Sequence, residues 1–525
     1  MKKALIFLSA VLFCVTALTA QQFKVEKSEV FDEPSNGWNK VFQLKNGNTF
    51  FFHGAHKEGL TITVYDKQRK IIATKELESK LWDVDDITDA DISGLYEISG
   101  EPVLFIYQSG NMYRIRLNPN DGTVVNEEDL GSFGDRKGSR TWATVEKDPA
   151  SDCYAVALIG FESIFSYDQQ IRICHFDGNH KMISEATYPM TGAGFKYVRL
   201  SKVLVDGNKC VYLLMHAANS KPEVPSTRFK IVVSRLNAGA KVFTHKTLKM
   251  NMELEDPYLD WVFNRKLNKI QLIIVSVEDS KKQFGTGKIT KYYSTLLTYI
   301  DPETMSVTGI KPMYGQKVSA YAQSHIDKNY QYSGVTSGMF VNYDNTTTIA
   351  MEEYRIVETK QILGAIGISE LNDTGAETAG YAINKEQVTQ GAHSILHQND
   401  KLKNKFSFPS SNIIKNAQFM SFDYVAAPKG NYVVFNDLAD NFENDEDESK
   451  SKKMSAASVS NAVCYRLNGD AIDRSFLFGE PKAGSSTFCF INGSDYNTAN
   501  NTYATIMIER DGRNKQSRIA WVTFE

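Results

Sequence analysis

The segment "SRIAWVTFE" (Ser517–Glu525) at the C-terminal end of the sequence decides the fold. It is mainly apolar and rich in residues that favour strands, so it predicts a buried β-strand. Two further predicted strands, "STFCFING" and "TYATIMIER", precede it, so the last unit of the chain holds three strands. A sheet of three strands leaves an exposed edge, and we therefore expect another part of the chain to supply a fourth strand.

The pattern of this segment recurs along the chain: an apolar strand is followed by Asp or Asn, a turn and another strand. The acidic or amide position is occupied by Asp66, Asn118, Asp177, Asn237, Asp301, Asn372 and Asn468, and by Glu525 in the final copy. The residue directly before it is apolar in every copy: Tyr65, Leu117, Phe176, Leu236, Ile300, Leu371, Leu467 and Phe524. Three positions further back, the residue is apolar in every copy except one, which has Arg114.

A predicted hairpin lies upstream of most copies, as in "KVLVDGNKCVYLLMH" and "YVAAPKGNYVVFND". Gly, Asn, Lys and Pro at the turns separate runs rich in Val, Tyr and Phe. Each unit therefore predicts four antiparallel strands. Several of these strands are apolar almost throughout, which indicates that both faces of each sheet are covered.

This organisation resembles a β-propeller, in which four-stranded blades repeat around an axis. The resemblance implies an all-β fold with eight blades in residues 21–525, closed by an outer strand from residues 22–32, "QFKVEKSEVF" and its flanks. The interval of 96 residues between Asn372 and Asn468 keeps a seven-bladed ring with one excursion open as an alternative. Two separate β-sandwiches are a third arrangement.

Residues 1–20 have a basic start, an apolar centre and small residues at the end, which is typical of a cleaved secretory signal. We expect a mature protein that begins near Gln21, is secreted or periplasmic, and is not inserted into a membrane. A net charge of −3 argues against nucleic acid as a partner. The cysteines beyond the signal have apolar neighbours and are expected to be packed thiols; if one disulfide forms, Cys153 with Cys174 is the favoured pair.

Residues 440–458, "DNFENDEDESKSKKMSAAS", place an acidic block before a basic one. Segments with such blocks of charge and few apolar residues do not bury a core. We therefore expect a mobile charged loop in this region.

The clearest local motif is "DADISGLYE", in which Asp89, Asp91, Ser93 and Glu97 alternate as oxygen donors around a glycine. Calcium takes six to eight oxygen ligands, and the motif is similar to the calcium loop of integrin-type propeller blades. These four residues are the candidate metal site, with exposed carboxylates as the alternative interpretation. No other cofactor is expected.

The sequence contains no G-x-S-x-G elbow, P-loop, dinucleotide fingerprint or H-E-x-x-H motif. The pairs His53/His56 and His393/His397 lack the spacing of a zinc site, and the adjacent Glu352 and Glu353 point to opposite faces of a strand. We therefore expect an exported, non-catalytic propeller that binds a protein or a glycan through one face of the ring. The alternative is a glycan hydrolase or lyase with its site at the central channel.

Overall fold

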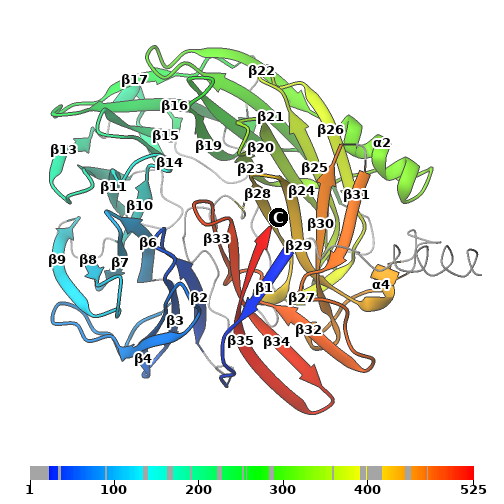
Figure 1. Cartoon of the computed structure of the whole chain (residues 1–525). Coiled ribbons are helices and arrows are strands. Elements are labelled where there is room, and N and C mark those ends of the chain that lie inside the picture. The colour runs from blue at the N-terminus through cyan, green and yellow to red at the C-terminus, as the bar shows by residue number, and fades with distance from the viewer. Residues whose placement is uncertain are drawn as a thin grey trace, which may run out of the picture.

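The computed structural model describes residues 23–32, 37–88, 91–133, 140–161, 169–189, 192–220, 228–250, 254–255, 257–282, 289–357, 360–390, 396, 398, 417–443, 451–469 and 471–524. These residues form eight separate antiparallel sheets, arranged as blades around a central axis (Figure 1). The predicted eight-bladed propeller is confirmed, and the seven-bladed ring and the pair of sandwiches are both wrong. The residues of the predicted signal lie outside the described ranges. Among the described residues, no helix is long and apolar enough to cross a membrane.

The first four blades follow the chain without interruption, each with its strands in sequence order from the axis outward. Blade 1 contains β2 (Trp38–Gln43), β3 (Thr49–Ala55), β4 (Gly59–Tyr65) and β5 (Ile71–Glu76), and blade 2 contains β6 (Ile92–Ile98), β7 (Glu101–Gln108), β8 (Asn111–Leu117) and β9 (Val124–Ser132). Blade 3 contains β10 (Arg140–Lys147), β11 (Tyr154–Phe161), β12 (Gln170–Phe176) and β13 (Met182–Tyr188). Blade 4 contains β14 (Tyr197–Asp206), β15 (Cys210–Ala218), β16 (Arg228–Asn237) and β17 (Thr244–Thr247), with β18 (Leu254–Glu255) beside β16.

In the described part of the remaining blades, the α-helices α2 and α4 lie in the connections between strands. Blade 5 contains β19 (Tyr258–Asn264), β20 (Lys269–Lys282), β21 (Ile289–Ile300) and β22 (Val307–Met313), and α2 (Gln316–His325) follows it. Blade 6 contains β23 (Val335–Val341), β24 (Thr347–Val357), β25 (Lys360–Leu371) and β26 (Glu377–Ile383), with β27 (Gln387–Gln390) beside β25. Blade 7 contains β28 (Phe422–Ala427), β29 (Gly430–Asp437), β30 (Asn461–Asn468) and β31 (Ala471–Phe476), with α4 (Ala439–Glu443) after β29.

Blade 8 is built from both ends of the chain. Its inner strands are β32 (Ser485–Cys489) with β33 (Asp495–Asn497), followed by β34 (Thr502–Asp511) and β35 (Asn514–Phe524). The outer strand is β1 (Phe23–Lys27), which pairs antiparallel with β35 from Phe23↔Phe524 to Lys27↔Ala520. The backbone contact continues past the strand, where the Ser28 N–H donates to the Ile519 carbonyl at 2.9 Å. The N-terminal segment therefore supplies the missing strand, as predicted.

The repeated sequence signature marks the third strand of each blade, namely β4, β8, β12, β16, β21, β25, β30 and β35. Every residue directly before the acidic or amide position is buried, and so is every residue three positions further back. The Asp or Asn then opens the turn to the fourth strand; the Asp66 carboxylate, for example, accepts the N–H groups of Gln68 and Lys70 at 2.9 Å each. The side chain thus stabilises the turn by accepting hydrogen bonds from its backbone N–H groups.

Arg114, the exception to the apolar pattern, is also buried. Its guanidinium donates to the Tyr154 hydroxyl of blade 3 and to the Glu128 carboxylate of its own blade. It also lies over the ring of Phe176, at 5.3 Å from the centroid. A buried cation is tolerated at this position because the Glu128 carboxylate pairs with its charge and the ring of Phe176 lies against it.

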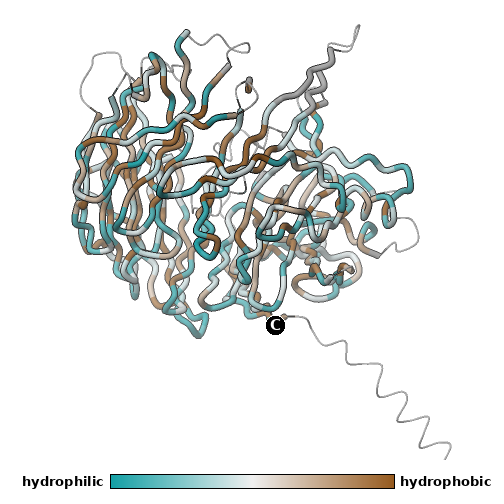
Figure 2. The backbone as a smooth tube through the Cα atoms, turned by 90° about the horizontal axis from the view of Figure 1, so that it is seen from above, coloured by the Kyte–Doolittle hydropathy of each residue, from teal (hydrophilic) through white to brown (hydrophobic). Residues whose placement is uncertain are grey.

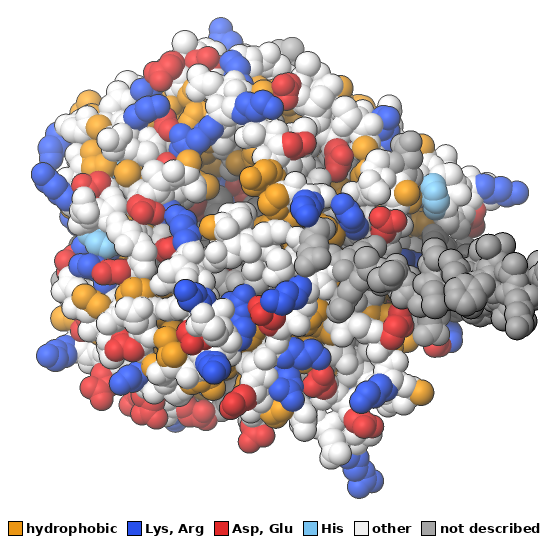
Figure 3. Space-filling view, in the orientation of Figure 1, with side chains coloured by type: hydrophobic (Ala, Val, Ile, Leu, Met, Phe, Trp, Pro, Cys, Tyr) orange, Lys and Arg blue, Asp and Glu red, His pale blue; other side chains and the backbone are white. Residues whose placement is uncertain are grey.

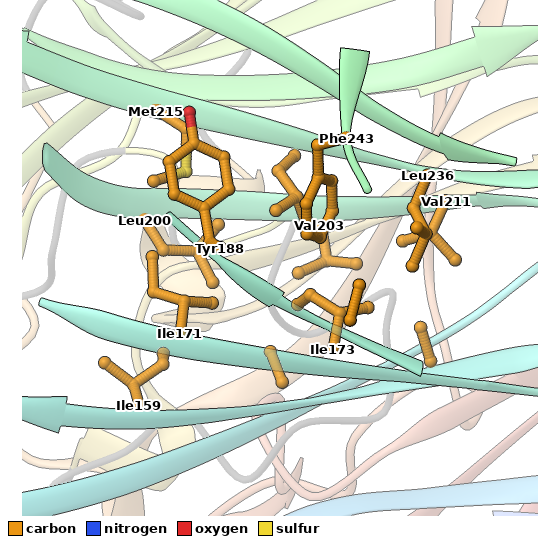
Figure 4. Close-up of a cluster of buried hydrophobic side chains, with 14 of the residues drawn as sticks. Ile159, Ile171, Ile173, Tyr188, Leu200, Val203, Val211, Met215, Leu236 and Phe243 are labelled. Carbon is orange, nitrogen blue, oxygen red and sulfur yellow. The ribbon is translucent and has the colours of Figure 1, made fainter. Parts of the chain in front are cut away.

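Apolar side chains fill the spaces between neighbouring blades. Between blades 3 and 4, residues such as Ile171, Ile173, Leu200 and Met215 lie against one another, and Tyr188 and Phe243 cover their outer end (Figure 4). Burial of such side chains stabilises the fold by about 25 cal/mol per Å² of apolar surface. Each sheet has an apolar neighbour on both faces, which explains why several strands are apolar almost throughout.

All five cysteines beyond the predicted signal are buried free thiols. The favoured pair, Cys153 with Cys174, does not form a disulfide. Cys174 lies opposite Val156 in the β11–β12 ladder, whereas Cys153 precedes β11. The register therefore offsets the two residues along the hairpin, and only the prediction of packed thiols is confirmed.

The described ends of the charged segment 440–458 are anchored. Asn441, in α4, donates to the Asp437 carboxylate at 2.8 Å and accepts the Lys452 N–H at 2.7 Å. Met454 is fully buried, and its N–H donates to the Glu386 carbonyl at 2.8 Å. Residues 444–450 lie outside the described ranges, and the mobile loop over residues 440–458 stays a prediction.

Removal of the closing strand tests the architecture. A mature chain that begins at Asp32 leaves the backbone of β35 unpaired along Ala520–Phe524, so we expect a markedly lower Tm and concentration-dependent association through the open edge. The control begins at Phe23 and keeps β1. Differential scanning calorimetry and size-exclusion chromatography measure both effects, and equal Tm values for the two chains would contradict the closure.

Candidate functional site on the loop face

The two faces of the ring differ in how their connections are built. On one face, here the turn face, short turns join the first strand of each blade to the second and the third to the fourth. On the other, the loop face, the second strand leads to the third and each blade leads to the next. Figure 2 shows the C-terminal end and the mainly hydrophilic turns along the lower edge of the ring, which is the turn face. The helix α2, between blades 5 and 6, packs against the outer strand β26, where the Lys317 N–H donates to the Glu377 carboxylate at 2.9 Å.

Polar groups on the turn face satisfy one another. The Asp177 carboxylate accepts the N–H groups of Asn179 and Lys181 at 2.9 Å each, and the Asn372 side chain does the same for Thr374 and Ala376 at 3.0 Å. Viewed from this side, Figure 3 shows Lys and Arg interspersed with Asp and Glu. The arrangement closes turns and offers no field of one sign to a ligand.

An ion-paired cluster joins blades 3, 4 and 5 on the turn face. Arg265 donates to the carboxylates of Asp148 and Asp206 at 2.7 and 2.8 Å, and both acids are buried. Burial raises the pKa of Asp148, but the hydrogen bonds from Ala150, Ser151 and Arg265 lower the pKa further and leave it below its ordinary value. The cluster holds the ends of β10 and β14 and the start of the β19–β20 turn at the same height along the axis of the ring.

The loop face carries exposed aromatic side chains at the inner edge of the ring. Trp142, near the start of β10, is 46% exposed, and Tyr258, the first residue of β19, is 45% exposed. Both belong to innermost strands, at the strand ends opposite the ion-paired cluster. Large aromatic groups that are exposed in such positions add apolar surface that a ligand could cover.

The sequence analysis did not identify either aromatic residue. A signal exists in "RTWATVEK", where Ala143 and Val145 are the apolar residues of one face and Trp142 stands among polar residues on the other. An aromatic residue on the polar face of an alternating strand is therefore worth examining as a surface contact.

A second feature of the loop face is a buried polar network between blades 6 and 7. Lys385, which follows β26, is fully buried and pairs with the Glu352 carboxylate at 2.6 Å. The other oxygen of this carboxylate accepts the hydroxyl of Ser421 at 2.9 Å. Ser421 has a φ of 67°, a strained value for a residue with a side chain. Gln387 receives hydrogen bonds from the Lys385 ammonium at 3.2 Å and from the Ser421 N–H at 2.8 Å.

The network continues into blade 8. Gln387 donates to the Asn436 carbonyl at 2.8 Å, and the Asn436 side chain donates to the carbonyls of Phe419 and Cys489 at 2.9 and 2.8 Å. These hydrogen bonds hold the segment before β28 against strand ends of blades 6, 7 and 8. Because the Ser421 hydroxyl donates to a carboxylate already neutralised by Lys385, the arrangement positions backbone and does not activate a nucleophile.

Asp437, at the end of β29, is a buried acid beside this network. It accepts hydrogen bonds from Asn441 and from the Leu438 N–H at 2.8 Å each. Burial nevertheless raises the pKa of Asp437 to about 6, although these hydrogen bonds and the charge of Lys385 oppose the change. Neither Lys385 nor Asp437 carries a recognisable sequence signal, since Lys385 follows an ordinary strand and Asp437 is the last residue of one.

Of the calcium candidates, Asp91, Ser93 and Glu97 are described, and their side chains do not converge. Asp89 lies outside the described residues. The Asp91 carboxylate accepts the N–H and hydroxyl of Thr88 at 2.8 Å each, whereas Glu97 is six positions further on, near the other end of β6, and accepts the Lys45 N–H at 3.1 Å. Six residues of strand span about 20 Å. Ser93 lies at a β-bulge between Ile92 and Gly94. No group of three or more metal-ligating side chains occurs among the described residues, and calcium binding stays a prediction.

The remaining candidates are engaged in separate contacts. Glu353 accepts the Tyr330 hydroxyl at 2.8 Å and the Ser333 N–H at 2.9 Å, away from the partners of Glu352. The two carboxylates have different partners because successive side chains of a strand point to opposite faces of the sheet. His53 contacts the Asn39 side chain at 3.0 Å, and His56 lies 3.3 Å from Asp86; His393 and His397 lie outside the described ranges.

No protein-family model and no curated protein sequence matches the chain. Among solved structures, the chain is similar to the WD40 domain of SCAP from fission yeast, with 8% identity, a TM-score of 0.39, and coverage of 96% of this chain and 98% of that one. It is also similar to the polysaccharide lyase Uly1, with 8% identity, a TM-score of 0.41, and coverage of 95% and 92%. A Synechocystis apocarotenoid oxygenase variant has 10% identity, a TM-score of 0.35, and coverage of 95% and 93%. At these scores the similarities assign no function.

Asp437 predicts a measurable pH dependence of stability. The folded protein holds this proton more tightly than the unfolded chain, so the contribution of Asp437 to the free energy of unfolding falls as the pH rises from about 4 to about 6. The total loss is about 3 kcal/mol. Asp437→Asn removes the titration while an amide oxygen can still accept both hydrogen bonds.

We therefore expect the stability of Asp437→Asn relative to wild type to rise across this pH interval and to level off above it. Urea denaturation of both proteins at a series of pH values measures the difference. Asp440→Asn, a substitution of a mostly exposed acid in the same region, is the matched control. A difference that does not change with pH would show that Asp437 titrates normally.

Proposed function

We propose that the protein is an exported, non-catalytic propeller that binds a protein or a glycan through its loop face. The observation that carries the proposal is the exposure of Trp142 and Tyr258 on innermost strands of this face. Exposed aromatic side chains are common binding anchors, because they bury much apolar surface and lose few rotamers. They also stack on the apolar faces of sugar rings.

We propose a non-catalytic role because three buried acids form hydrogen bonds or ion pairs with other groups of the fold. Glu352 is paired with Lys385, and Asp148 with Arg265. The Asp423 carboxylate, on the inner strand of blade 7, accepts the hydroxyls of Ser494 and Tyr503 at 2.5 and 2.6 Å. A general acid or base needs a proton that can pass to or from a substrate, and these groups serve contacts within the fold.

The loop face is tested by paired substitutions. The mature protein, Trp142→Ala with Tyr258→Ala, and the control Tyr343→Ala are applied to a glycan array and to an activity panel of polysaccharides. Tyr343 is 64% exposed but lies in the β23–β24 turn on the turn face. We expect the double variant to lose at least tenfold in affinity, since each aromatic anchor contributes about 1 kcal/mol or more, and the control to bind as wild type.

Two outcomes would overturn the proposal. Turnover of any polysaccharide by the wild-type protein would favour the glycan hydrolase or lyase. Binding that is lost in Tyr343→Ala and kept in the double variant would place the ligand on the turn face.

Export is tested separately. The full-length chain is expressed in a bacterial host with a periplasm, and the N-terminus of the accumulated protein is sequenced. We expect removal of residues 1–20, a start near Gln21 and recovery outside the cytoplasm. A cytoplasmic protein that retains Met1 would contradict this part of the proposal.

A further inference from the structure

The two oxygens of the buried Asp437 carboxyl group have very different surroundings. The Leu438 N–H and the Asn441 side chain both donate to Oδ1 at 2.8 Å. Among the described residues, no hydrogen bond reaches Oδ2, although Asp437 is only 2% exposed. An ionised carboxylate has about four lone-pair positions to satisfy, so a buried one with two donors is poorly compensated. The geometry therefore favours the neutral acid, and burial accordingly raises the pKa of Asp437 to about 6.

The charged groups around Asp437 do not supply the missing compensation. Burial outweighs the charge of Lys385, whose ammonium already lies 2.6 Å from the Glu352 carboxylate. The described charged side chains of the neighbouring elements are paired with one another, namely Asp440 with Lys452, and Glu386 with Lys453 and Arg355. Ionisation of Asp437 would thus place a charge in the fold without a cation of its own.

Asn441 joins this carboxyl group to another part of the connection between β29 and β30. Its side-chain N–H groups donate to Asp437 Oδ1 and to the Lys452 carbonyl at 2.8 Å each. Its side-chain oxygen accepts the Lys452 N–H at 2.7 Å. A change at Asp437 that moves Asn441 therefore also breaks the backbone contacts of Lys452.

The helix α4, which carries Asn441, depends on tertiary contacts, because five residues are too few for a stable isolated helix. Besides the bonds of Asn441, these contacts include an exposed ion pair between Asp440 and Lys452, which contributes little. They also include the packing of Phe442 on Phe476, with ring centroids 4.1 Å apart. The bond between Asn441 and Asp437 is thus one of a small number of contacts that hold the helix.

The chain is anchored separately at Met454, two positions after Lys452. Met454 is fully buried, its N–H donates to the Glu386 carbonyl at 2.8 Å, and its carbonyl accepts the Val388 N–H at 2.9 Å. These bonds attach the chain to β27 and its flank and do not involve Asp437. The contacts of α4 with Lys452 can therefore break while Met454 stays in place.

We propose that Asp437 is the proton-sensitive group of a conformational switch on the loop face: its neutral form keeps α4 docked and joined to Lys452, and its ionised form releases α4. The docked state holds the proton more tightly than the released state, in which water solvates the carboxylate. Docking is therefore favoured at low pH and weakens as the pH rises from about 4 to about 6. The inference does not depend on the ligand proposed for this face.

Site-resolved hydrogen–deuterium exchange of the mature protein tests the switch between about pH 4 and about pH 7. The reporters are the Leu438 N–H, which is bonded to Asp437, and the Lys452 N–H, which is bonded to Asn441. The Met454 N–H reports opening of the surrounding fold. Protection factors correct each rate for the pH dependence of intrinsic exchange.

We expect both reporters to be less protected than Met454. Their protection should fall by up to about a hundredfold as the pH rises, because a pKa difference of about two units corresponds to that factor. Low urea concentrations should leave the exchange of the reporters unchanged and accelerate that of Met454, because release of α4 exposes much less surface than unfolding does.

Three variants assign the effect. Asp437→Asn keeps an oxygen that can accept both hydrogen bonds but cannot ionise, so the reporters should keep their low-pH protection throughout. Asn441→Ala removes the link, so the Lys452 N–H should exchange rapidly at every pH. Asp440→Asn removes a mostly exposed acid of the same helix; it is the control and should keep the wild-type pH dependence. If Asp437→Asn does not fold, the wild-type series and Asn441→Ala decide.

Three results would overturn the switch. Protection of Leu438 and Lys452 that does not change with pH in the wild type would show that ionisation does not release α4. The same urea dependence for these reporters as for Met454 would show that α4 opens only with the surrounding fold. A pH dependence that persists in Asp437→Asn would assign the effect to another group.

Discussion

The pairing of β1 with β35 is the constraint on which the whole ring depends. Each blade covers its apolar faces with its two neighbours, so a closed ring is the arrangement in which no blade is left uncovered. Blade 8 brings three strand positions from the C-terminal end of the chain, and the ladder from Phe23↔Phe524 to Lys27↔Ala520 supplies the fourth. The closure joins residues almost 500 positions apart. Trp521 of blade 8 also packs against Tyr65 of blade 1, so the last blade is held against the first.

A closed ring also divides the molecule into two surfaces with different uses. Polar atoms on the turn face are occupied by Asx turns and by the bonds of Arg265 to Asp148 and Asp206. The loop face holds a buried network, from Glu352 through Lys385 and Gln387 to Asn436, that fixes the chain leading into blade 7. Buried charges stabilise little by themselves. Their effect here is positional, because they join three blades at the end where the aromatic residues are exposed.

The fold could be predicted because its signal is local and repeated. An apolar residue before Asp or Asn marks the third strand in every blade, and even Arg114 proved to be a buried position. The site could not be predicted in the same way. Trp142 and Tyr258 stand on the innermost strands of different blades, and their exposure on one face follows only from the assembled ring. Glu97 shows the opposite case, since it is near Asp91 in the sequence but separated from it by the length of β6.

Several buried acids of this scaffold are engaged by other groups of the fold. Catalysis by carboxylates requires at least one acid whose proton exchanges with a substrate, yet Glu352, Asp148 and Asp423 each accept hydrogen bonds or ion pairs from the fold. Asp437 has a raised pKa, but it is buried against Asn441 and its own helix end. The rings of Trp142 and Tyr258 remain open at the inner edge. These acids therefore serve contacts within the fold, which supports the proposed binding role of the loop face.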